Sequence, residues 1–142
     1  MNKWTYIRVA LIVIGIILAL WRGPTSSHVS PLIDGKALIV AFVFGMFGLQ
    51  FVLGIQALNK KSAEVWSPPS WKENPFSLKQ PLQFAHFGGC FFVVLSFTSA
   101  VLTWLGKPEV IFDSLMPFCL GIGIIGGVHV SRLLFKKKFK SV

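Results

Sequence analysis

Residues 59–81, NKKSAEVWSPPSWKENPFSLKQP, decide how this 142-residue chain is organised, because they form its longest polar stretch and separate two apolar halves. The stretch holds four lysines but only two glutamates. Cytoplasmic loops of membrane proteins carry an excess of lysine and arginine. The charge therefore predicts that residues 59–81 form a cytoplasmic loop, with membrane-spanning helices before and after it.

The overall composition supports a membrane protein. Hydrophobic residues make up 54% of the chain and charged residues 13%, and the mean hydropathy is +0.69. A soluble domain has about a quarter of its residues charged. The net charge of +9 is concentrated at the ends of the apolar blocks. We therefore expect the basic residues to contact anionic lipid headgroups and not nucleic acid.

Four apolar blocks are predicted to be membrane-spanning helices, because about 20 apolar residues suffice to cross a bilayer as a helix. They cover residues 5–21, 36–58, 82–105 and 110–135. The first block also has the length of a signal peptide, but Trp21 and Arg22 stand where cleavage needs small residues. The predicted fold is a single all-α domain over residues 1–142, a bundle of four transmembrane helices in two antiparallel hairpins.

The distribution of basic residues predicts the orientation. Of the 14 lysines and arginines, three lie on the predicted outer side, Arg22, Lys36 and Lys107, and the other eleven lie on the inner side. Both termini are therefore expected in the cytoplasm. The expected location is a bacterial inner membrane. At its surface, the loop residues predicted to lie among the lipid headgroups are Trp66, Trp71, Lys72 and Lys79.

Small residues indicate where the helices approach each other. Membrane helices associate through glycines that let their backbones come close. The glycines predicted at such contacts are Gly45, Gly48, Gly88, Gly89, Gly123, Gly126 and Gly127. Cys90 and Cys119 lie in apolar runs without a C-x-x-C motif, so we interpret both as packing residues.

A sparse polar layer is predicted in the cytoplasmic half of the bundle, formed by Gln56, His86, His129 and Arg132. The preferred interpretation is neutral, hydrogen-bonded packing. A second is a pocket for an anionic headgroup or small acidic ligand, with Arg132 supplying the charge. A third is a bis-histidine haem or metal site, for which no further ligand is offered. We therefore expect no cofactor and no metal.

The sequence gives little support for catalysis. Cys90 lies one helical turn after His86, but no third group is placed to orient the pair as a nucleophile and its base. The preferred function is that of a non-catalytic membrane protein acting by helix association, as an accessory subunit or an inhibitor or immunity-type partner of a membrane complex. Its expected partners are lipids and another membrane protein or a second copy. The alternative is a small transporter, flippase or channel that holds an anionic headgroup or solute in the polar layer.

Overall fold

The chain folds into four long helices. The computed structural model describes residues 2–23, 35–60, 67–77, 79–106 and 111–140, with side chains for all of these except 49–60, 111–114 and 134–140. The helices are α1 (Lys3–Arg22), α2 (Gly35–Lys60), α3 (Pro81–Gly106) and α4 (Ile111–Lys140). The prediction of an all-α fold with four helices is confirmed.

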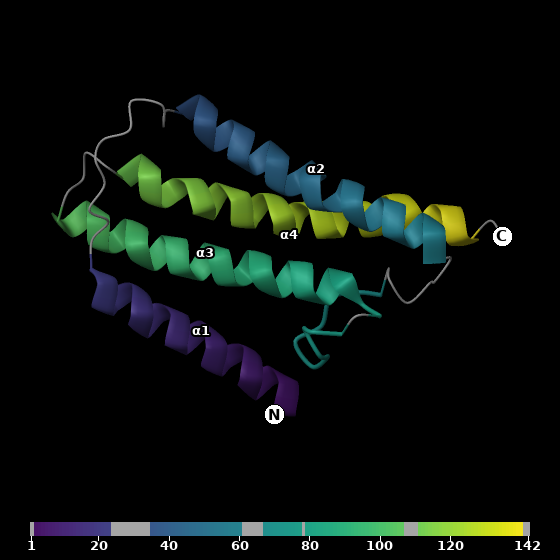
Figure 1. Cartoon of the computed structure of the whole chain (residues 1–142), viewed down its shortest axis with the longest axis horizontal. Helices are drawn as coiled ribbons and strands as arrows, with labels where there is room; N and C mark the ends of the chain where they lie inside the picture. The colour runs from purple at the N-terminus through teal and green to yellow at the C-terminus, as the bar shows by residue number, and fades with distance from the viewer. Residues whose placement is uncertain (1, 24–34, 61–66, 78, 107–110, 141–142) are drawn as a thin grey trace.

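The helices lie side by side in an open row, in the spatial order α1, α3, α4, α2 (Figure 1). Helices α1 and α3 run in one direction and α2 and α4 in the other. The helices therefore share two ends along their axes. The start of α1, the end of α4 and the polar segment 67–77 lie at one of them, which we call the loop end. The opposite end, where α1 and α3 finish, is called the far end.

The row agrees with the predicted second hairpin and corrects the first. Helices α3 and α4 pack closely along their length as antiparallel neighbours. Helices α1 and α2, in contrast, occupy opposite edges of the row and do not pack against each other in the described part of the chain, so the predicted first hairpin was wrong. The reason is that each of these helices finds better partners elsewhere: α1 has polar contacts to the loop end of α3, and α2 has glycine contacts to α4.

Glycines allow close packing between α2 and α4. A Cβ atom added to Gly45 would overlap the backbone oxygen of Leu120, and one added to Gly123 would overlap the backbone oxygen of Phe42. Both glycines are buried. Only a residue without a side chain lets the two backbones come this close.

A second pair of glycines forms the contact between α3 and α4. A Cβ atom on Gly89 would lie 2.8 Å from Ile125 Cγ1 and 3.0 Å from the Gly121 oxygen, and one on Gly121 would lie 2.9 Å from the Gly89 oxygen. Helix α1 uses a glycine of its own, Gly15, where a Cβ would lie 2.9 Å from the ring of Phe91 on α3. Each neighbouring pair in the row therefore meets at a glycine.

The remaining predicted glycines do not all sit at tight contacts. Within the described part of the chain, a Cβ atom on Gly88 would meet nothing within 4 Å. At Gly48 the nearest atoms belong to Phe44 of the same helix, at 3.5 Å, and at Gly126 the nearest is Met46 Cε, at 4.0 Å. Gly127 is buried. Among the described residues, Gly88 and Gly48 therefore make no backbone contact of the kind seen at Gly45 and Gly123.

Among the residues that the structure describes, three helical segments are long and apolar enough to cross a membrane: Lys3–Arg22, Pro81–Gly106 and Leu115–Leu133. The part of α2 with described side chains, Gly35–Gly48, is also apolar but shorter. Many large apolar side chains on α1, α2 and α3 are exposed, among them Ile17, Phe44 and Phe97. These features fit a membrane protein.

The glycine contacts yield a direct test. We expect Gly123→Ala to lower the free energy of unfolding by about 1–3 kcal/mol, because the added methyl overlaps backbone that cannot move independently. The matched control Gly88→Ala adds the same methyl into open space. It should keep or raise stability, by up to about 1 kcal/mol, because alanine is the better helix former. Thermal unfolding of the two purified variants in detergent measures the difference, and equal stabilities would contradict this packing.

Candidate functional site

A buried arginine joins α1 to the loop end of α3. The Arg8 side chain is 0% exposed. Its Nη2 donates to the backbone oxygen of Glu73 at 2.9 Å and to Gln83 Oε1 at 3.4 Å. The guanidinium carbon also lies 5.5 Å from the ring centroid of Trp71 and 5.6 Å from that of Phe87. The charge is therefore enclosed by a carbonyl, an amide and two aromatic rings, an arrangement that compensates part of the cost of removing it from water.

Gln83, in the first turn of α3, is the second centre of this site. It is 0% exposed, and both the oxygen and the nitrogen of its carboxamide form hydrogen bonds. Its oxygen accepts the Ser70 N–H at 2.9 Å as well as the bond from Arg8, and its Nε2 donates to the Pro68 oxygen at 2.9 Å. Gln83 thus holds the beginning of segment 67–77 against α3.

The first two turns of α1 hold the same segment from the other side. Three consecutive carbonyls, those of residues 71–73, each accept a hydrogen bond from α1 or its N-cap. The donors are Thr5 Oγ1 at 3.1 Å, Asn2 Nδ2 at 2.9 Å and Arg8 Nη2 at 2.9 Å. Asn2 also caps α1, since its Oδ1 accepts the Trp4 N–H at 3.2 Å. We call Asn2, Thr5, Arg8 and Gln83 the loop clasp.

The clasp does not satisfy every donor of Arg8. Its Nε and Nη1 atoms are buried and have no hydrogen-bond partner among the described residues. A buried donor without a partner costs about 1–3 kcal/mol, more for a charged group. The remaining contacts of Arg8 must therefore be strong enough to hold it in place.

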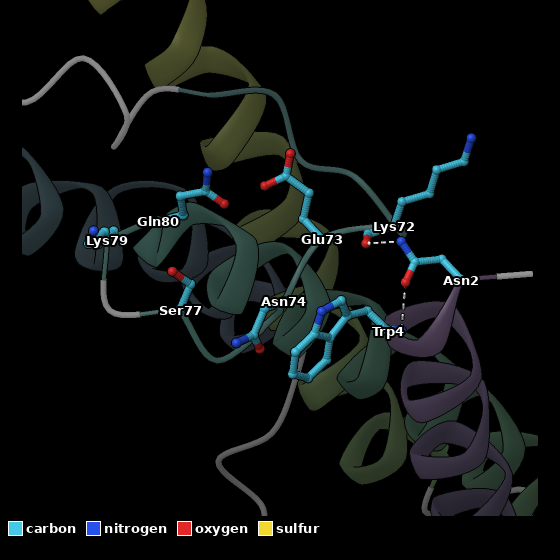
Figure 2. A pocket seen from close by; sticks show the side chains of 8 residues that line it. All are labelled: Asn2, Trp4, Lys72, Glu73, Asn74, Ser77, Lys79 and Gln80. Atoms are coloured by element: carbon cyan, nitrogen blue, oxygen red, sulfur yellow. Dashed lines mark hydrogen bonds between the residues drawn. The ribbon is translucent and has the colours of Figure 1, made fainter.

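Beside the clasp lies an open polar cleft of about 590 Å³. Figure 2 shows its lining from α1 and the loop: Asn2, Trp4, Lys72, Glu73, Asn74, Ser77, Lys79 and Gln80. The Lys72 side chain extends outward, away from Lys79, and both lysines are exposed. Trp71 is also partly exposed, at 38%. Of the four predicted headgroup residues, Lys72 and Lys79 thus line this cleft, Trp71 does not, and Trp66 falls outside the described residues.

The two predicted histidines come together on neighbouring helices. The rings of His86 on α3 and His129 on α4 lie edge to face with their centroids 5.8 Å apart. Cys90 Sγ lies 4.0 Å from His86 Nδ1, one turn further along α3. Arg132 is half-buried one turn after His129, and the side chain of Gln56 lies outside the described residues. The structure therefore brings together two of the four predicted polar-layer residues.

This histidine pair offers limited chemistry in the described part of the chain. No group of three or more histidine, cysteine, aspartate or glutamate side chains is placed there to hold a metal ion. The Cys90–His86 contact is longer than the 2.6–3.2 Å of an activated nucleophile and its base. What the geometry does provide is a polar patch of adjacent imidazoles within an otherwise apolar helix pair.

The clasp was the feature that sequence reasoning missed. Neither Arg8 nor Gln83 was singled out. The signal was present, because a glutamine amide inside an apolar helix must find a partner. Gln83, the second residue of the apolar block 82–105, is such a glutamine.

The fold is all-helical, and three helices among the described residues have the length and apolar composition to cross a membrane. Comparison with protein-family models, with curated proteins and with solved structures finds no match to this chain. Its function must therefore be inferred from its own residues.

Removal of Gln83 tests the clasp. We expect Gln83→Leu to lower stability by about 3–5 kcal/mol, because it takes a partner from a buried charge and leaves the Ser70 N–H and Pro68 oxygen unpaired. Hydrogen exchange should become faster at the Ser70 amide. Gln80→Leu is the matched control, since Gln80 lines the open cleft, and it should change stability by no more than about 0.5 kcal/mol. Unchanged Ser70 exchange in Gln83→Leu would contradict the role given to this residue.

Proposed function

We propose that this chain is a four-span integral membrane protein with both termini and segment 67–77 in the cytoplasm. We propose further that it acts by helix contact, as an accessory subunit or an inhibitor or immunity-type partner of a membrane complex. The orientation is supported by the eleven basic residues at one end of the apolar blocks against three at the other. Because α2 spans 26 residues, it is long enough to be the fourth span.

The observation that carries this proposal is the open row of helices. The edge helices α1 and α2 each pack against one principal neighbour, so each keeps a broad outer face. A closed ring of four helices would enclose an interior in which a solute path could run. An open row instead offers two edges to which further helices can be added, and this favours a contact function over transport.

The edge formed by α2 is the better candidate for the contact. Ile39, Val40, Val43, Phe44 and Phe47 recur at helical spacing and are all exposed, Phe44 by 69% and Phe47 by 61%. Aromatic side chains are enriched in protein interfaces, where they supply most of the binding energy. We therefore propose that α2 meets a helix of another membrane protein through the surface around Phe44.

A second candidate function rests on the histidine pair. His86 and His129 lie close enough to bind one ligand together, and the half-buried Arg132 follows one turn later. Such a patch would suit an anionic headgroup or solute carried by a small transporter, flippase or channel. It ranks second because it rests on one contact between two rings, whereas the contact function rests on the arrangement of all four helices.

Cysteine labelling tests the orientation. In a background in which Cys90 and Cys119 are alanine, we expect Arg22→Cys to react with a membrane-impermeant maleimide added to intact cells. Lys72→Cys should react only after the membrane is permeabilised, because the charge bias places it inside. Labelling of Lys72→Cys in intact cells would overturn the proposed topology.

Photo-cross-linking tests the contact function. A benzoylphenylalanine at position 44 should give one protein adduct of defined mass in native membranes, because a specific interface holds the partner close to the side chain. The same group at Phe97 on α3, which is similarly exposed at 61%, is the matched control and should give no such adduct. If position 44 yields no protein adduct, the contact function is wrong and the histidine pair becomes the better basis for a function.

A further inference from the structure

An apolar groove opens between α1 and α3 toward the far end of the row. It has a volume of about 510 Å³. Its walls come from Leu18 and Ala19 on α1 and from Phe91, Phe92 and Leu95 on α3, and Pro117 of α4 also contributes to the lining. The groove begins beyond the point where Gly15 lies against Phe91. It therefore occupies the part of the α1–α3 pair that lies past their closest approach.

A single positive charge stands at the mouth of this groove. Arg22, the last residue of α1, contributes to the lining and is exposed. Its guanidinium makes no hydrogen bond or ion pair within the described part of the chain. The end of α1 is capped by another group, because the Gly23 N–H bonds to the oxygens of Ala19 and Leu20 at 3.2 Å. The Arg22 side chain is thus available to an external anion.

The dimensions of the groove suit a hydrocarbon chain better than a protein helix. The α3 residues that line it run from Phe91 to Ser99, which corresponds to about 12 Å along the helix axis. That length is comparable to one leaflet of a bilayer, about 15 Å. A helix of the same length and about 10 Å in diameter would need roughly 900 Å³. A partner helix could enter this open groove only in part, whereas an extended acyl chain can lie along its whole length.

We propose that this groove binds an anionic phospholipid of the outer leaflet, with one acyl chain between α1 and α3 and the phosphate on Arg22. An apolar groove with one guanidinium at its mouth is complementary to an amphiphile with a negatively charged head. The proposal goes beyond the contact function. Of the proposed function, it requires only that the chain spans the membrane. It uses the α1–α3 side of the row, whereas the proposed protein contact uses α2.

Native mass spectrometry of the full chain in mild detergent tests the proposal. Phosphatidylglycerol and phosphatidylcholine with identical chains are the probes. We expect the unaltered protein to retain phosphatidylglycerol about tenfold more strongly, because both lipids present a phosphate to Arg22 but phosphatidylcholine also carries a choline cation that Arg22 repels. Arg22→Gln should abolish this preference and leave weak binding of both lipids. An equal retention of both lipids by the unaltered protein would overturn the proposal.

Two alanines of α1 provide a matched test of the groove itself. Ala19 lines the groove, whereas Ala10 is exposed on the same helix and does not line it. Ala19→Phe should reduce binding of both lipids at least fivefold, and Ala10→Phe should leave it unchanged. Equal effects of the two substitutions would place the lipid elsewhere and contradict the assignment. Inorganic phosphate should not displace the lipid, since it lacks the chain; displacement by phosphate would show a headgroup site without the groove.

These outcomes are separable from those of the contact function. The cross-linking at position 44 reports on the α2 edge, and the lipid measurements report on α1 and α3. A lipid preference without a protein adduct would support the groove alone, and an adduct without a lipid preference would support the contact alone.

Discussion

The structure depends on the burial of one charge, that of Arg8. A guanidinium removed from water must be surrounded by hydrogen-bond acceptors and polarisable groups, because an uncompensated buried charge is strongly destabilising. Segment 67–77 provides the Glu73 carbonyl and the Trp71 ring, and α3 provides Gln83 and the Phe87 ring. One side chain thereby fixes three parts of the chain relative to each other. This explains why segment 67–77, which contains three prolines, takes a defined course.

Glycines position the other elements. Helix α4 lies between α2 and α3 and meets each of them through glycines: Gly45 and Gly123 at the contact with α2, and Gly89 and Gly121 at the contact with α3. With both of its sides occupied in this way, α4 leaves α1 only the outer side of α3. Close backbone packing and the buried arginine together therefore produce an open row. In a bilayer, such a row presents most of its side chains to lipid or to other helices, and this is why function is more reasonably sought at its edges and grooves than in an enclosed interior.

The two ends of the row differ in chemistry. The loop end has exposed lysines, a polar cleft and a network of hydrogen bonds to backbone carbonyls. The far end has an apolar groove and a single arginine. In the proposed orientation the loop end meets the cytoplasmic headgroups and the groove lies in the outer leaflet. The protein would then be anchored at one surface by several charges and engage a single lipid near the other.

The sequence by itself determined that the chain is helical, where the helices lie and that His86 and His129 sit at the same depth on adjacent helices, because hydrophobic length and helical rise are local properties. It also contained Gly45, Gly89 and Gly123 as contact residues, but it could not separate them from Gly88, since glycine is equally apolar on every face of a helix. Only the tertiary structure decided that α1 joins α3 and not α2, that Arg8 pairs with Gln83, and that a groove ends at Arg22. Each of these depends on contacts between residues that are 65 or more positions apart in the sequence. Such pairings are set by the fit of side chains in space.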